Sequence, residues 1–102
     1  MVIKIRPEKR EEYKKLHASI WPVVLDLLKK ANIGNISIYY KDDTLFEYLE
    51  YSGADFEADI SILMANPVYK KWLKVCDACQ QPLDTRKKGE WWAKMEEVFH
   101  CD

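Results

Sequence analysis

Three side chains with useful chemistry follow one another at helical spacing near the start of the chain. Tyr13, His17 and Trp21 are each four residues apart, so they line one face of a helix that has 3.6 residues per turn. Imidazole exchanges protons near neutral pH, a phenol donates and accepts hydrogen bonds, and an indole offers a flat apolar surface. This combination suits a small hydroxylated ligand with a C–H face, such as a sugar. A second interpretation stays open: His17 is a core histidine bonded to a backbone carbonyl, and Tyr13 is ordinary packing.

These side chains belong to a longer motif that resembles a known family. Residues 11–22 read Glu-Glu-Tyr-x-x-x-His-x-x-Ile-Trp-Pro, which resembles the helix signature of the L-rhamnose mutarotase family. Further segments resemble that family in the same order: a central hairpin at residues 35–39 and 45–46, a Trp-bearing helix at 70–72 and a closing strand at 95–100. The resemblance spans nearly the whole chain and is weakest in the loop at residues 80–90.

The resemblance implies a reaction and roles for three residues. His17 matches the family's catalytic proton donor, Tyr13 matches a tyrosine that binds substrate, and Trp72 matches the first of two adjacent tryptophans that contact the sugar. We expect Trp72 to stack on the C–H face of the sugar. Mutarotation opens and recloses the ring of a monosaccharide by proton transfer, so no metal, cofactor or covalent intermediate is expected. The resemblance also implies a homodimer.

Two positions depart from the family pattern. Leu73 stands where the family has its second tryptophan, and Ile36 stands where it has a hairpin tyrosine that contacts substrate. Because Ile36, Ile38 and Tyr40 share one face of a strand, we expect the Tyr40 hydroxyl to take the place of the missing one. These changes concern substrate identity more than fold: L-rhamnose is the first expectation, and L-fucose or another hexose or deoxyhexose is the alternative.

Composition sets limits on the broad class of protein. The chain has 102 residues, and we expect a single domain over residues 1–102. Net charge is −1, from 16 basic and 17 acidic residues, so nothing favours nucleic acid as a partner. No apolar run approaches the roughly 20 residues of a membrane span, and the first residues do not resemble a signal peptide. A cytoplasmic protein without a membrane partner is expected.

The cysteines raise the question of a metal or redox site. Cys76 and Cys79 form a C-x-x-C pair, and His100 and Cys101 lie near the other end of the sequence. The pair ends a helical pattern instead of lying in a knuckle loop, and His100 and Cys101 would point to opposite faces of a strand. No strand precedes the pair, as a thioredoxin-type motif requires. We therefore expect neither zinc nor redox chemistry here.

Hydrophobic periodicity predicts an α+β fold of the ferredoxin-like type. The order is β-α-β-β-α-β, with helices on one face of an antiparallel sheet. The family resemblance implies that a second protomer covers the other face, as in dimeric α/β-barrels. Phe46 and Tyr48 should occupy one face of the sheet and Leu45 the other. Pro22 and Asn66-Pro67 should break each helical region in two. The expected elements are strands at 2–6, 36–40, 44–51 and 91–100, helices at 7–20, 23–31, 54–65 and from 68 onward, and a polar loop at 80–89.

Packing can be predicted for the third helical segment as well. Its apolar residues, Phe56, Ile60, Leu63 and Met64, are expected to face inward, and Val75 and Cys76 should lie on the same side of the next helix as Trp72.

Three functions remain in competition. They are a sugar mutarotase, a non-catalytic sugar-binding or structural relative on the same dimeric fold, and a ferredoxin-like monooxygenase or heme-degrading enzyme.

Overall fold

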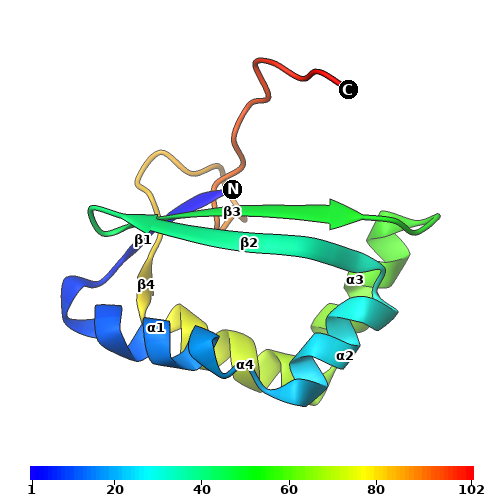
Figure 1. The fold of residues 1–102 in the computed structure, drawn as a ribbon, viewed down its shortest axis with the longest axis horizontal. Coiled ribbons are helices and arrows are strands. Elements are labelled where there is room, and N and C mark those ends of the chain that lie inside the picture. The colour runs from blue at the N-terminus through cyan, green and yellow to red at the C-terminus, as the bar shows by residue number, and fades with distance from the viewer.

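A four-stranded antiparallel sheet forms one layer of the molecule, and all four α-helices cover one of its faces (Figure 1). The computed structural model describes residues 1–102. Its elements are β1 (Val2–Ile5), a 3₁₀ turn η1 (Pro7–Lys9), α1 (Arg10–Ala18), α2 (Pro22–Lys30), β2 (Ile33–Lys41), β3 (Thr44–Tyr51), α3 (Phe56–Ala65), α4 (Pro67–Asp77) and β4 (Gln80–Gln81). The strand order is β2-β3-β1-β4, so the two β-α-β units interleave. This confirms the predicted ferredoxin-like α+β fold.

Both helical regions break where proline follows a capping position. α1 ends at Ala18 and α2 begins at Pro22, because proline lacks the N–H group that would continue the helical hydrogen bonds. Asn66 separates α3 from α4, and its side-chain oxygen accepts hydrogen bonds from the backbone N–H groups of Val68 and Tyr69. The predicted breaks are therefore confirmed.

The central hairpin joins the two longest strands by a tight turn. Asp42 and Asp43 both have positive φ angles, 50° and 56°, as the two central residues of a type I′ turn require. Asn35, with φ of 46°, lies where the β2–β3 register shifts between Gly34 and Ser37. That bulge marks the beginning of the regular part of the hairpin, which faces α1.

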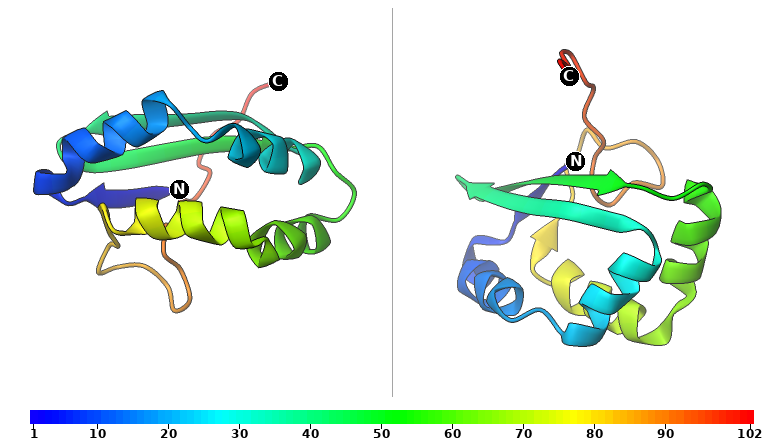
Figure 2. Two further views of the ribbon diagram at one scale, coloured as in Figure 1. Left: turned by 90° about the horizontal axis from the view of Figure 1, so that it is seen from below. Right: turned by 45° about the vertical axis from the view of Figure 1, so that its right-hand side comes forward.

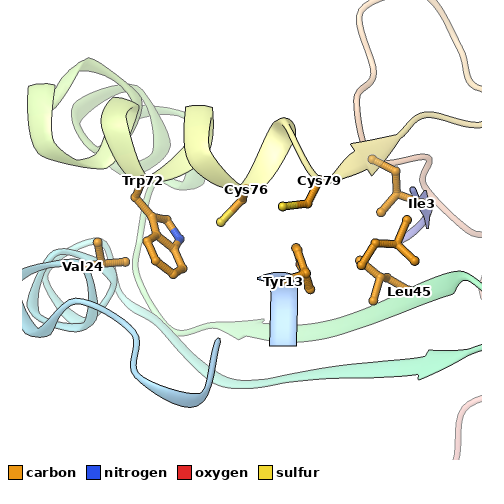
Figure 3. Close-up of a cluster of buried hydrophobic side chains, with 8 residues drawn as sticks. Ile3, Tyr13, Val24, Leu45, Trp72, Cys76 and Cys79 are labelled. Carbon is orange, nitrogen blue, oxygen red and sulfur yellow. The ribbon is translucent and has the colours of Figure 1, made fainter. Parts of the chain in front are cut away.

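The core lies between the sheet and the helices and has two parts. The larger cluster, drawn in Figure 3, fills the space near β1 and α4, and Leu45 of β3 is buried in it. The smaller cluster packs Ala31, Ile33 and Leu63 together near the other end of the sheet. Phe46 and Tyr48 point to the uncovered face and are exposed. No helix combines the length and the apolar run that a membrane span needs.

The predicted last strand is wrong. The strand that pairs with the edge of β1 is β4, which lies inside the predicted polar loop. Ala93 exchanges two backbone hydrogen bonds of 2.9 Å with Val2, but the residues after it form no strand. They leave the sheet on the side opposite the helices (Figure 2), where Val98 and Phe99 are 87% and 81% exposed. Alternation of residue types predicted a strand, but Ala93 alone of this segment pairs with a strand, at Val2 of β1.

Several side chains also differ from their predicted positions. Leu63 is buried and Ile60 is half-buried, as expected of the inner side of α3. Phe56 and Met64 are exposed, because the amphipathic face of this short helix is narrower than its apolar content suggests. On α4, Cys76 is buried with Trp72, whereas Val75 lies at the exposed margin.

Candidate active site

Helix α1 brings Tyr13 and His17 into direct contact. Their ring centroids lie 4.1 Å apart with an angle of 26° between the planes, a stacked arrangement set by the one-turn spacing. The Nδ1 atom of His17 lies 2.9 Å from the backbone oxygen of Tyr13. A carbonyl oxygen only accepts, so Nδ1 carries the proton and donates it, which leaves the lone pair of the neutral ring on Nε2. Burial lowers the pKa of His17, which favours this neutral form.

A cavity of about 290 Å³ opens between α1 and the inner face of the sheet. Its volume is close to the lower end of the range of small-molecule sites, which begins at about 300 Å³. One wall comes from α1 and the other from the strands. The lining residues are Ile5, Tyr13, Lys14, His17, Ala18, Ile38, Tyr40 and Leu45. The apolar strand residues and the polar groups of α1 together match a small ligand with both hydroxyl and C–H surfaces.

Tyr40 lines this cavity, on the same side as Ile38. Its hydroxyl donates a 2.9 Å hydrogen bond to the Asp43 carboxylate and accepts one of 3.2 Å from Arg10. The ammonium group of Lys14 lies 4.9 Å from the centre of its ring. The hydroxyl is thus held at the cavity wall by two charged groups and keeps one lone pair for another donor.

Trp72 of α4 lies behind His17 and does not line the cavity. Its ring is 6% exposed, and its centroid lies 5.4 Å from that of His17 and 5.2 Å from that of Trp21. The structure therefore brings Tyr13, His17 and Tyr40 to one cavity and places Trp72 as the support of the imidazole ring. Leu73 is half-buried against the core, and Ile36 lies at the exposed margin of β2.

Gln80, which the sequence did not single out, fixes the other end of Tyr13. Its side chain is 2% exposed, accepts a 2.8 Å hydrogen bond from the Trp91 indole and donates one of 3.2 Å to the Tyr13 hydroxyl. The indole can only donate, so it determines which way the amide is turned. Burial raises the pKa of Tyr13 well above its usual value, so the side chain stays a neutral phenol. Its own proton has no acceptor in the protein and remains for a ligand.

The C-x-x-C pair belongs to the core. Cys76 and Cys79 are buried free thiols at the end of α4, visible among the core side chains in Figure 3. Burial raises their pKa values to about 12 and about 11. The Cys79 thiol donates to a Glu12 carboxylate oxygen at 3.4 Å. No three His, Cys, Asp or Glu side chains converge in the geometry of a metal site.

Known proteins are similar to this chain in both sequence and fold. The sequence model of the L-rhamnose mutarotase family matches residues 1–101. The chain belongs to the L-rhamnose mutarotase family. An L-rhamnose mutarotase of Phocaeicola vulgatus is 34% identical over 96% of this chain and 91% of its own length. Another of Lactiplantibacillus plantarum is 32% identical over 99% of this chain and 94% of its own length.

A solved structure gives an independent comparison of the fold. The crystal structure of an L-rhamnose mutarotase from Formosa agariphila matches with a TM-score of 0.74, over 99% of this chain and 94% of the other. The two sequences are 24% identical, so this likeness bears on the fold. Family membership favours the mutarotase prediction over the monooxygenase or heme-degrading alternative, which rested on the fold alone.

Proposed function

We propose that this protein is a sugar mutarotase that interconverts the α and β anomers of L-rhamnose or a similar deoxyhexose. The observation that carries the proposal is the stacked Tyr13–His17 pair at the wall of a cavity of monosaccharide size, on the motif characteristic of the family. Relatives named L-rhamnose mutarotase make that sugar the first candidate. L-Fucose and other hexoses or deoxyhexoses are the next, since Ile36 and Leu73 change the expected sugar contacts.

His17 is the proposed proton-transfer group. Ring opening removes the proton of the anomeric hydroxyl, adds a proton to the ring oxygen and breaks the bond between that oxygen and the anomeric carbon. The free Nε2 of His17 takes the anomeric proton, while the Nδ1–H bond to the Tyr13 carbonyl holds the ring in place. After the aldehyde rotates, the imidazolium gives the proton back to the carbonyl oxygen as the ring closes. One such group contributes about 10²- to 10⁴-fold in rate.

The remaining predicted residues bind the sugar or support the site. The free proton of the Tyr13 hydroxyl donates to a sugar oxygen, and the Tyr40 hydroxyl accepts from a sugar hydroxyl. Trp72 was predicted to stack on the sugar. Its buried position supports a narrower role in which its edge closes the space behind His17, and stacking requires the surrounding side chains to move.

A homodimer and a cytoplasmic location are further parts of the proposal. The uncovered sheet face carries exposed aromatic residues, Tyr39, Phe46 and Tyr48, and apolar patches of this kind are typical of interfaces. Sedimentation analysis of the wild type and of Phe46→Glu tests the dimer, which should dissociate in the variant. The three free thiols fit a reducing compartment, which cell fractionation tests.

A non-catalytic relative is the second candidate. Ile36 and Leu73 remove two side chains that the family resemblance assigns to substrate, and this favours a protein that binds sugar without turning it over. Saturation-transfer NMR separates the two candidates. Anomer exchange is measured for L-rhamnose, L-fucose and other reducing sugars, each against buffer. Acceleration of one sugar supports the mutarotase, and binding without acceleration of any sugar supports the second candidate.

A further inference from the structure

A carboxylate lies on the inner face of the sheet, between the two parts of the core. Side chains alternate along β3, so Leu45, Glu47 and Leu49 all face the helices. Leu45 is buried in the larger cluster and lines the cavity, and Leu49 packs against the smaller one. Glu47 occupies the position between them. An acidic residue is unexpected there, because burial of a carboxylate has a high free-energy cost unless it has partners.

The neighbours of Glu47 place it beside the cavity. Across the hairpin it pairs with Ile38, which lines the cavity. Across the sheet, its backbone N–H donates to the Met1 oxygen at 2.9 Å, and its backbone oxygen accepts from the Met1 amino group at 3.0 Å. Its charge acts on the phenols of Tyr13 and Tyr69 and raises the pKa of each. Glu47 thus lies directly opposite Ile38 and two residues from Leu45, and both of these residues line the cavity.

The Glu47 carboxylate has no partner in the protein. It forms no ion pair, since the salt bridges join Lys9 to Glu12, Glu11 to Arg10 and Lys14, and His100 to Asp102, and no hydrogen bond reaches its oxygens. Every fully buried polar side-chain atom of the protein has a hydrogen-bond partner. Because the Glu47 carboxylate oxygens have none, they are not fully buried and are accessible to solvent or a ligand. Glu47 is not itself among the lining residues, but a half-buried, unpartnered and accessible carboxylate next to two residues that line a cavity is typical of a functional group.

This inference rests on the proposed function. Ring opening needs a second group to protonate the ring oxygen, because His17 is taking the proton of the anomeric hydroxyl at the same moment. We propose that Glu47 is a catalytic residue that protonates the ring oxygen of the sugar while His17 takes the proton of the anomeric hydroxyl. The Glu47 O–H bond breaks, the ring C–O bond breaks, and a carboxylate and an imidazolium remain. Ring closure reverses both transfers, so each residue ends in the state in which it began.

The surroundings of Glu47 support the required proton. Burial raises the pKa of Glu47, and the nearby Met1 amino group opposes this only in part. The groups that face it are the phenols of Tyr13 from α1 and Tyr69 from α4 and the amino group of Met1. Both phenols are neutral at pH 7, because burial raises the pKa of each. The pair of His17 and Glu47 must hold one proton to be active, which predicts a bell-shaped pH profile of turnover.

The test compares Glu47→Gln with the wild type and with Glu57→Gln, which removes an exposed carboxylate on α3. Anomer exchange of L-rhamnose is followed by saturation-transfer NMR over a series of pH values, after circular dichroism has shown that each variant is folded. We expect Glu47→Gln to lose about 10²-fold in turnover and to retain a single titration in its pH profile. Glu57→Gln should keep the wild-type rate and the bell-shaped profile.

The outcomes separate this inference from the proposed function. If Glu47→Gln accelerates anomer exchange as much as the wild type, with the same pH profile, the role of Glu47 is overturned. The proposed mutarotase function is then unaffected. No acceleration by the wild type for any sugar overturns both. If Glu47→Gln does not fold, the pH profile of wild-type turnover decides. Two titrations in that profile support the pair of Glu47 and His17. A single titration, together with loss of activity in His17→Ala, contradicts the pair.

Discussion

The two helical regions are built on the same plan and differ in how firmly they are held. Each is a helix, a break at proline and a second helix. Between α1 and α2 the break is three residues long, and no side chain caps either end. Between α3 and α4 it is the single residue Asn66, which caps the next helix with two hydrogen bonds. The firmly held region supplies Trp72 and Cys76 to the core, and the looser one carries the cavity. The proton transfer by His17 is thus assigned to the helical region with less internal constraint, and Trp72 of the other region supports it from behind.

Truncation of Trp72 should have the largest effect on stability. Trp72→Ala removes a buried indole that contacts both His17 and Trp21, so we expect a loss of about 3–5 kcal/mol in the free energy of unfolding. Chemical denaturation measures it, with Lys71→Ala on the exposed side of α4 as the control. A loss no greater than that of Lys71→Ala would show that α4 does not anchor the structure.

The substitution of the buried amide that holds Tyr13 of α1 should have the next largest effect. Gln80→Met leaves the Trp91 indole and the Tyr13 hydroxyl without their shared partner, which should cost about 1–3 kcal/mol. Gln81→Met, at the exposed neighbouring position, is the matched control. Sugar affinity should also fall in Gln80→Met alone, because Tyr13 loses its fixed position. Equal stability of the two variants would show that this buried amide contributes nothing.

The two breaks themselves can be compared directly. Asn66→Ala removes a side-chain cap and should cost about 0.5–2 kcal/mol. Ser19→Ala, at the end of α1, removes a side chain that caps nothing and should leave the free energy of unfolding unchanged. Thermal denaturation of both variants gives the difference. A similar loss in the two would remove the contrast between the helical regions.

The pH dependence of stability should show the smallest effect. Burial lowers the pKa of His17 in the folded protein below its unfolded value of about 6.5. The unfolded chain therefore binds the proton first, so the contribution is fully present above that pH and is lost as pH falls through the folded pKa. Urea denaturation of wild type and His17→Asn between about pH 5 and 8 should show a shallower decline in the variant. Parallel curves would contradict the burial of the neutral imidazole.

Local features of the fold were predictable, and long-range ones were not. Pro22, Asn66-Pro67 and the Asp42–Asp43 turn each act on their own backbone, so the helix breaks and the hairpin followed from the sequence. The contact of Tyr13 with His17 followed in the same way from the spacing of one helical turn. The last strand failed because alternation predicts an extended segment and does not show whether a strand edge is available to it.

The candidate site divides in the same way. The cavity wall from α1 was predicted, and Tyr40 of β2 joined it through strand alternation. Gln80 was assigned to a loop, because nothing in a polar sequence shows that an amide 67 residues away will reach the Tyr13 hydroxyl. Glu47 lies in a strand of alternating residues where either face could have been the buried one. Trp72 was predicted to stack on the sugar from one side of its helix, and its depth behind His17 was not predictable because it depends on how three elements meet.

The most direct test of the account is the rate of L-rhamnose anomer exchange by His17→Ala, compared with the wild type and with Lys15→Ala on the exposed side of the same helix. We expect His17→Ala to stay folded by circular dichroism and to lose about 10²- to 10⁴-fold in turnover, while Lys15→Ala keeps the wild-type rate. A folded His17→Ala that exchanges the anomers as fast as the wild type would show that the proton-transfer group lies elsewhere.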